Sequence, residues 1–113
     1  FPRDVFAYLV DKAWDRLHLI KSEEEILPGI RVFWTGGHTA GSQAVSVETA
    51  KGTTIITGDV VFLYKNIERS IPIGCAINVI ECLDAMKRIR EEAKIILPGH
   101  DPEPEHINTA FKR

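Results

Sequence analysis

Three short strand-like runs in this chain each end at a glycine beside a residue that can bind a metal ion. The motifs at these ends are GGHTAGS (36–42), TGDVVF (57–62) and LPGHD (97–101). Glycine lets the backbone turn sharply and approach a ligand without a clash at Cβ. Strands of one sheet can end at the same edge, so we expect His38, Asp59 and His100 to converge there. Two imidazoles and a carboxylate form a ligand set for zinc or a neighbouring transition metal.

Alternating and β-branched patterns predict the strands that would carry these motifs. Strands are expected over 30–35, 43–49 and 53–57, joined by tight turns, and a short buried strand over 95–97. Residues 22–25 are interpreted as a polar break, and 64–75 as an irregular segment interrupted by proline and glycine.

Helical periodicity appears on both sides of these strands. Residues 4–20 place apolar side chains on one face and charged ones on the other, which predicts an amphipathic helix. A second helix should begin near Asn78, with Glu81 completing a capping box. Its apolar side is expected to contain Ile80, Leu83, Met86 and Ile89.

Composition limits the classes of protein to consider. The 113 residues form one domain at most, and 44% of them are hydrophobic, as in a folded core. The net charge of -2 gives no reason to expect nucleic acid, and no apolar run or signal pattern indicates a membrane. Cys75 and Cys82 are expected to be reduced, in a cytoplasmic protein. The chain begins at Phe1 rather than Met, so we expect it to be processed, truncated or incompletely sampled.

The ordered motifs HTAGS, TGD and PGHD resemble the C-terminal half of the metallo-β-lactamase superfamily, and most closely its N-acyl homoserine lactonase-like branch. The likeness runs from about Leu27 to Glu103. It implies an α/β fold that is half of an αβ/βα sandwich, with a mixed sheet and helices on one face. Residues 1–113 would then be the C-terminal part of a single domain whose N-terminal half is absent from this chain.

The resemblance also assigns a metal centre. It places His38 on a first divalent metal ion and His100 on a second, both expected to be zinc, with Asp59 as the bridging, catalytic carboxylate. The family's other ligands come from an HxHxDH motif in the N-terminal half, which this sequence does not contain. Of the remaining histidines, His18 and His106 are interpreted as solvated or partly packed side chains.

For several other residues the sequence allows two roles. Thr39 and Ser42 either support the ligands by hydrogen bonds or simply close a turn, and Asp101 either orients an imidazole or lies on the surface. Lactonases of this branch commonly place a tyrosine three residues after the bridging aspartate, where this chain has Phe62. Tyr64 either takes over that catalytic role or is a core or surface tyrosine. Trp14 and Trp34 are expected in core or interdomain packing.

Three functions fit these observations. The preferred one is a metal-dependent hydrolase in which a metal-bound hydroxide attacks an ester or lactone carbonyl of a small molecule. The others are a glyoxalase II-like thioester hydrolase and a non-catalytic interaction domain. The expected partner is the N-terminal half, as a separate fragment or chain, without which this chain should be inactive; a homodimer is a further option.

Overall fold

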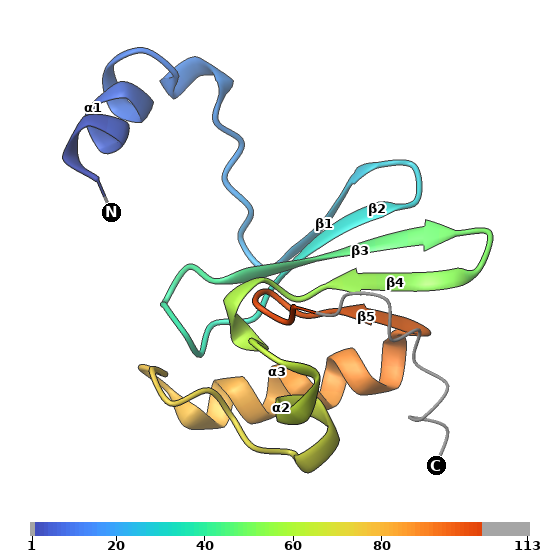
Figure 1. Ribbon diagram of the computed structural model, residues 1–113. Helices are drawn as coiled ribbons and strands as arrows, with labels where there is room; N and C mark the ends of the chain where they lie inside the picture. Colours follow the sequence, from blue (N-terminus) through green and yellow to red (C-terminus); the bar gives the residue numbers. More distant parts are fainter. Residues whose placement is uncertain (1, 103–113) are drawn as a thin grey trace.

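Five strands form one mixed sheet, and four of them lie where the sequence predicts strands. A computed structural model describes residues 2–102, so the expectations for His106 and the C-terminal tail lie outside the described residues. The strand order is β1-β2-β3-β4-β5 (Figure 1), with antiparallel pairs throughout except for parallel β4 and β5. The strands are β1 (Glu23–Leu27), β2 (Ile30–Trp34), β3 (Gln43–Thr49), β4 (Gly52–Ile56) and β5 (Ile95–Leu97).

Two helices cover one face of this sheet. These are α2 (Tyr64–Arg69) and α3 (Val79–Glu92), which connect β4 to β5 and lie below the sheet in Figure 1. The core joins sheet residues such as Phe33, Ile55 and Ile96 to the buried side of α3, formed by Cys82, Ala85, Met86 and Ile89. Helices on one face are therefore confirmed. Along the expected apolar side of α3, Met86 and Ile89 are buried, but Ile80 is 66% exposed and Leu83 is 37% exposed.

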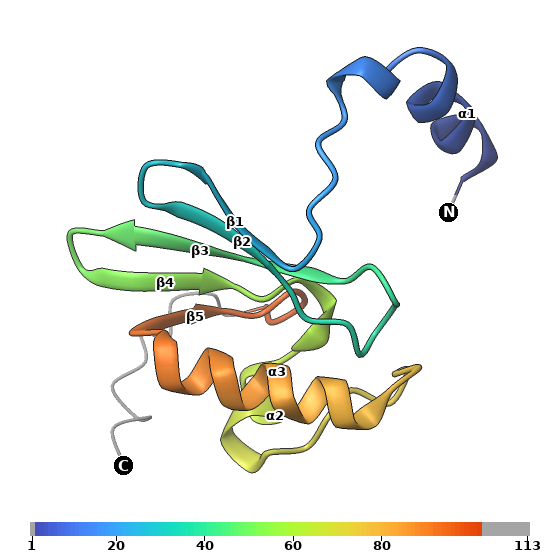
Figure 2. The ribbon, with the colours of Figure 1, turned by 180° about the vertical axis from the view of Figure 1, so that it is seen from behind.

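The first helix is shorter than predicted. Helix α1 covers Arg3–Asp11, and Trp14–Arg16 form a separate 3-10 turn rather than extending it to residue 20. Figure 2 shows α1 apart from the sheet, at the end of an extended segment. No residue of α1 is buried, so its apolar stripe has no packing to stabilise a longer helix. Within residues 2–102, no helix has the length and apolar character needed to cross a bilayer.

Two elements contradict the sequence interpretation. Residues 23–25 of the predicted polar break at 22–25 belong to β1, because the carboxylates of Glu23 and Glu24 have side-chain partners. Glu23 lies 3.2 Å from Arg31 and 2.8 Å from Arg88 of α3, while Glu24 pairs with His18. The predicted irregular segment contains α2, which buries Tyr64 and Ile67.

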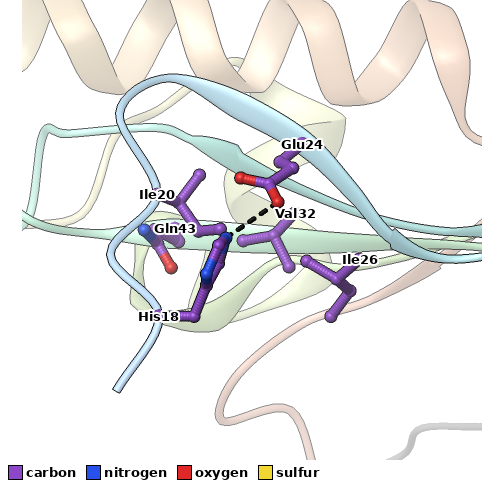
Figure 3. A pocket seen from close by; sticks show the side chains of 6 residues that line it. All are labelled: His18, Ile20, Glu24, Ile26, Val32 and Gln43. Atoms are coloured by element: carbon purple, nitrogen blue, oxygen red, sulfur yellow. Dashed lines mark hydrogen bonds and ion pairs between the residues drawn. The ribbon is translucent and has the colours of Figure 1, made fainter. Parts of the chain in front are cut away.

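The second face of the sheet is apolar and lies opposite α2 and α3. Strand pairing aligns Val32, Val45, Ile56 and Leu97 in one row across four strands. In the described part of the chain no helix covers this row, and Ile56 is 45% exposed. A hollow of about 430 Å³ lies beside Val32 (Figure 3), lined by His18, Ile20, Glu24, Ile26, Val32 and Gln43.

Candidate metal centre

The structure brings the three candidate ligands together at one edge of the sheet. His38 lies in the loop after β2, Asp59 in the 3-10 turn Gly58–Val60 after β4, and His100 after β5. The His100 Nε2 atom is 2.9 Å from Asp59 Oδ1, and His38 Nε2 is 3.6 Å from Asp59 Oδ2. Each imidazole therefore faces a different oxygen of the same carboxylate.

The hydrogen bond of His38 to the backbone shows that this arrangement suits a cation. His38 Nδ1 lies 3.2 Å from the carbonyl oxygen of Cys75. A carbonyl can only accept, so Nδ1 carries the proton, and in the neutral ring Nε2 presents a lone pair. That lone pair faces an Asp59 oxygen, which is also an acceptor. Two facing acceptors favour a cation between them, so His38 and Asp59 fit a metal ion. On the other side of the carboxylate, His100 Nε2 is within hydrogen-bond distance of Asp59 Oδ1.

These ligands are nevertheless an incomplete set. Among residues 2–102, no group of three or more His, Cys, Asp or Glu side chains could hold a metal ion by itself. The candidate side chains are also open to solvent, with relative exposures of 25% for His38, 48% for Asp59 and 58% for His100. The three side chains therefore need further ligands to hold a metal ion. Their exposure leaves space at this edge for those ligands and for a substrate.

Backbone hydrogen bonds hold the Asp59 and His100 loops against each other. The N–H groups of Gly99 and His100 each donate, over 2.9 Å, to the carbonyl oxygens of Val61 and Phe62. A Cβ on Gly99 would lie 2.7 Å from the Gly58 carbonyl oxygen, so only glycine allows this approach.

Thr57 is a supporting residue that the sequence reasoning missed. Its side chain is completely buried, and the hydroxyl donates to the Val61 carbonyl over 3.1 Å. This contact closes the turn that presents Asp59. The sequence signal for this role is a threonine at the end of an apolar strand, just before Gly58-Asp59.

Phe62 lies beside both candidate histidines. Its ring centroid is 4.5 Å from that of His100 and 5.8 Å from that of His38, and both contacts are edge-to-face. Such contacts restrict the tilt of each imidazole. Phe62 therefore forms an apolar wall of the site. It stands three residues after Asp59, the position at which the family resemblance leads us to expect a tyrosine.

Tyr64 is not brought together with the three ligands. Its buried hydroxyl donates to the Ile96 carbonyl oxygen over 2.8 Å, which supports its reading as a core residue. Burial raises the pKa of the Tyr64 hydroxyl, and the nearby charge of Asp101 adds to that rise. The Asp101 carboxylate accepts the Tyr64 backbone N–H over 2.9 Å, so it anchors the His100 loop to α2.

The contacts of Thr39 and Ser42 match the turn reading. The Thr39 backbone N–H donates to Ser42 Oγ over 3.0 Å, and the two hydroxyls lie 2.8 Å apart. Trp34 braces the same loop, because its indole N–H donates to the Ala40 carbonyl over 2.8 Å.

Among the described residues, the others singled out in the sequence make no contact with the three candidate ligands that bears on their predicted roles, except for Cys75. His18 pairs with Glu24 across an exposed surface. Trp14 is 58% exposed and Trp34 41%, so neither lies in the core of the described residues. Cys75 and Cys82 are free thiols.

Comparisons with known proteins identify lactonases and a probable metallo-hydrolase as relatives of this chain. The chain is 32% identical to an N-acyl homoserine lactonase of Bacillus thuringiensis over 98 residues, which is 82% of this chain and 39% of the relative. It is 33% identical to a probable metallo-hydrolase of Methanocaldococcus jannaschii, over 73% of this chain and 39% of the relative. No family model matches the chain.

A solved structure gives the same result for the fold. An N-acyl homoserine lactone hydrolase, with the product N-hexanoyl-L-homoserine bound at its catalytic metal centre, matches with a TM-score of 0.68 and 30% identity. The match covers 78% of this chain and 37% of that chain. This chain therefore spans less than half the length of its relatives. In sequence it is similar to N-acyl homoserine lactonases, which are hydrolases, and its fold is part of the metallo-β-lactamase fold.

Proposed function

We propose that this chain contributes His38, Asp59 and His100 to a dinuclear metal centre of a hydrolase that opens lactones. The observation that carries this proposal is the arrangement around Asp59, where each carboxylate oxygen faces one imidazole. A carboxylate that bridges two metal ions needs this arrangement, with a separate nitrogen ligand on each side. Zinc is the proposed metal, because histidine and carboxylate ligands are typical of catalytic zinc sites.

The relatives support the choice of substrate class. The Bacillus thuringiensis relative is an N-acyl homoserine lactonase, and the similar solved structure holds an opened N-acyl homoserine at a metal centre. This chain spans 39% of the first and 37% of the second. We therefore propose lactone opening as the activity of the whole protein, not of this chain alone.

The chain's own residues would divide the work at this site. Divalent ions, when bound, would polarise the substrate carbonyl and lower the pKa of a water molecule. Asp59 and the two histidines would hold those ions, while the Cys75 carbonyl keeps the proton of His38 on Nδ1. Phe62 would limit movement of both imidazoles and keep one side of the site apolar. The phenol of Tyr64 donates to the Ile96 carbonyl, which supports a core role for Tyr64 rather than a catalytic one.

We further propose that residues 1–113 form the C-terminal part of a single domain. The row Val32, Val45, Ile56 and Leu97, over which no described helix lies, would then pack against an N-terminal half that supplies the missing ligands. The exposure of Ile56 in this row, at 45%, supports this assignment, because apolar residues on such a surface mark a contact with another part of a protein. An HxHxDH motif in the part of the gene that precedes Phe1 is the expected finding.

Metal analysis of the full-length gene product tests the ligand assignment. We expect about two zinc ions per molecule in the wild type, as in paired-metal hydrolases. Asp59→Asn and His100→Ala should each lose at least one ion, whereas His18→Ala, a matched exposed histidine, should retain both. Equal metal content in all four proteins would refute the assignment.

A substrate panel separates the three candidate activities. Lactones, open-chain esters and thioesters would be offered to the zinc-loaded protein and to Asp59→Asn. Lactone opening that is lost in Asp59→Asn is the expected result. Preference for thioesters would favour the glyoxalase II-like alternative, and no turnover with full metal content would favour a non-catalytic domain.

A further inference from the structure

Both peptide groups of Gly37, the residue just before His38, are held by residues at the start of α3. The Gly37 N–H donates to Glu81 Oε2 over 2.9 Å. The Gly37 carbonyl oxygen accepts the N–H groups of Ile77 and Asn78, over 2.8 and 3.1 Å. The backbone that carries His38 is therefore tied to a segment about 40 residues away in sequence, as well as to β2.

Close packing makes this attachment rigid. Gly37 has a φ of +76°, and a Cβ on it would lie 2.5 Å from Cys82 Sγ and 3.0 Å from the Cys82 nitrogen. With no side chain in between, the Gly37 peptide lies directly against α3. The imidazole of His38 is held from the same segment, by the Cys75 carbonyl.

The cap of α3 leaves the Glu81 carboxylate free for this contact. The sequence predicts that Glu81 completes a capping box with Asn78. Instead, Asn78 Oδ1 accepts the N–H groups of Ile80 and Glu81, while the Asn78 N–H donates to Gly37. The helix is thus capped by Asn78, and the carboxylate of Glu81 binds the His38 loop.

We propose that Glu81 is a positioning residue for His38. Its carboxylate fixes the Gly37 peptide and so places the His38 imidazole opposite Asp59 Oδ2. This role rests on the proposed function, in which His38 binds a metal ion. Removal of groups that orient metal ligands typically weakens metal binding about 10- to 100-fold.

The test compares two substitutions of Glu81 in the full-length gene product. Glu81→Leu removes the acceptor, whereas Glu81→Gln keeps an acceptor oxygen. Glu91→Leu, at an exposed position on the same helix, is the matched control. The first measurement is amide hydrogen exchange at Gly37 and His38 in metal-free protein. The second is a cobalt titration that resolves two binding events by their absorption spectra.

We expect Glu81→Leu to exchange faster at Gly37 and to bind one of its two ions about 10- to 100-fold more weakly. Glu81→Gln should retain most of the protection and affinity, and Glu91→Leu should resemble the wild type. Unchanged exchange and affinity in Glu81→Leu would overturn the proposal. Equal weakening of both ions, with a lower unfolding temperature, would also overturn it by indicating a general effect on stability. Failure of the wild type to bind two ions would instead refute the proposed function.

Discussion

At the scale of single residues, the candidate centre depends on the groups that contact the candidate ligands. Phe62 touches both imidazoles, and the Cys75 carbonyl fixes the proton of one. The groups in contact are the Phe62 ring and the Cys75 backbone carbonyl. Their effect is to limit the orientations that His38 and His100 adopt before any ion arrives. Orientation of ligands in advance reduces the entropy lost on binding.

Phe62→Ala should weaken metal binding by about tenfold, since aromatic contacts of this kind contribute about 0.5–1.5 kcal/mol each. Competition between the protein and a chelating dye measures the change. Phe6→Ala is the control, because Phe6 is 60% exposed on α1. If Phe62→Ala and Phe6→Ala bind zinc equally well, Phe62 does not hold the histidines.

Tyr64→Phe should separate a structural role from a catalytic one. The substitution leaves the Ile96 carbonyl without its hydroxyl partner, so stability should fall by about 1 kcal/mol. Turnover of a lactone should be unchanged, because the hydroxyl is directed into the core. Urea unfolding and steady-state kinetics give the two values. A fall in kcat of more than about tenfold, which corresponds to about 1.4 kcal/mol of transition-state stabilisation, would restore Tyr64 as a catalytic residue.

At the scale of elements, β1 joins the sheet because its charges find partners in other elements. Glu23 of β1 pairs with Arg31 of β2 and with Arg88 of α3, and the Arg88 guanidinium lies over the Phe33 ring. The hydrogen bond from Arg88 is the main cause of a lowered pKa at Glu23, with Arg31 adding to it. A run of glutamates that looks like a loop in the sequence is thus an edge strand in the fold.

Glu23→Gln should therefore change the acid stability of the protein. A lowered carboxyl pKa adds stability above the unfolded-state value of about 4.3, and that stability is lost as the pH falls through the folded-state value. The variant should be less stable at pH 7, by less than about 1 kcal/mol because the pair is partly exposed, and should lose less on acidification. Urea unfolding at several pH values measures both effects. Glu68→Gln, on the exposed side of α2, should show neither.

At the scale of the whole molecule, the sheet is covered on one face only within the described residues. Helices α2 and α3 bury Phe33, Ile55 and Ile96, whereas the opposite row that includes Val45 and Ile56 has no helix over it. The candidate ligands lie at the edge of this half-covered sheet. Completion of the core and completion of the metal centre are therefore expected to come from the same N-terminal half.

Val45→Glu should show whether this face is buried in the full-length gene product. An unpaired charge in a packed interface costs several kcal/mol, so we expect a loss of more than about 2 kcal/mol in the free energy of unfolding. Ala50→Glu, at the exposed position just after the same strand, should cost less than about 0.5 kcal/mol. Equal small effects of both substitutions would mean that the face stays open to water.

The sequence alone was enough to predict most of the sheet, helix α3 with its cap, and the three candidate ligands. These features are local: strand alternation, an asparagine that caps a helix, and glycines beside histidine or aspartate can each be recognised within a few residues. The part missed by this reasoning was β1, α2, Thr57 and the attachment of Glu81 to Gly37.

What only the tertiary structure decided was how these local pieces meet. Glu23 supports a strand because Arg88, 65 residues away, neutralises it, and Tyr64 is a core residue because the Ile96 carbonyl lies within reach of its hydroxyl. Hydrogen bonds and ion pairs between distant segments depend on distances that local patterns do not contain. Residue types and spacing therefore determined which side chains are candidates for metal binding. The packing of β4, β5 and α3 determined that two of them face opposite oxygens of Asp59.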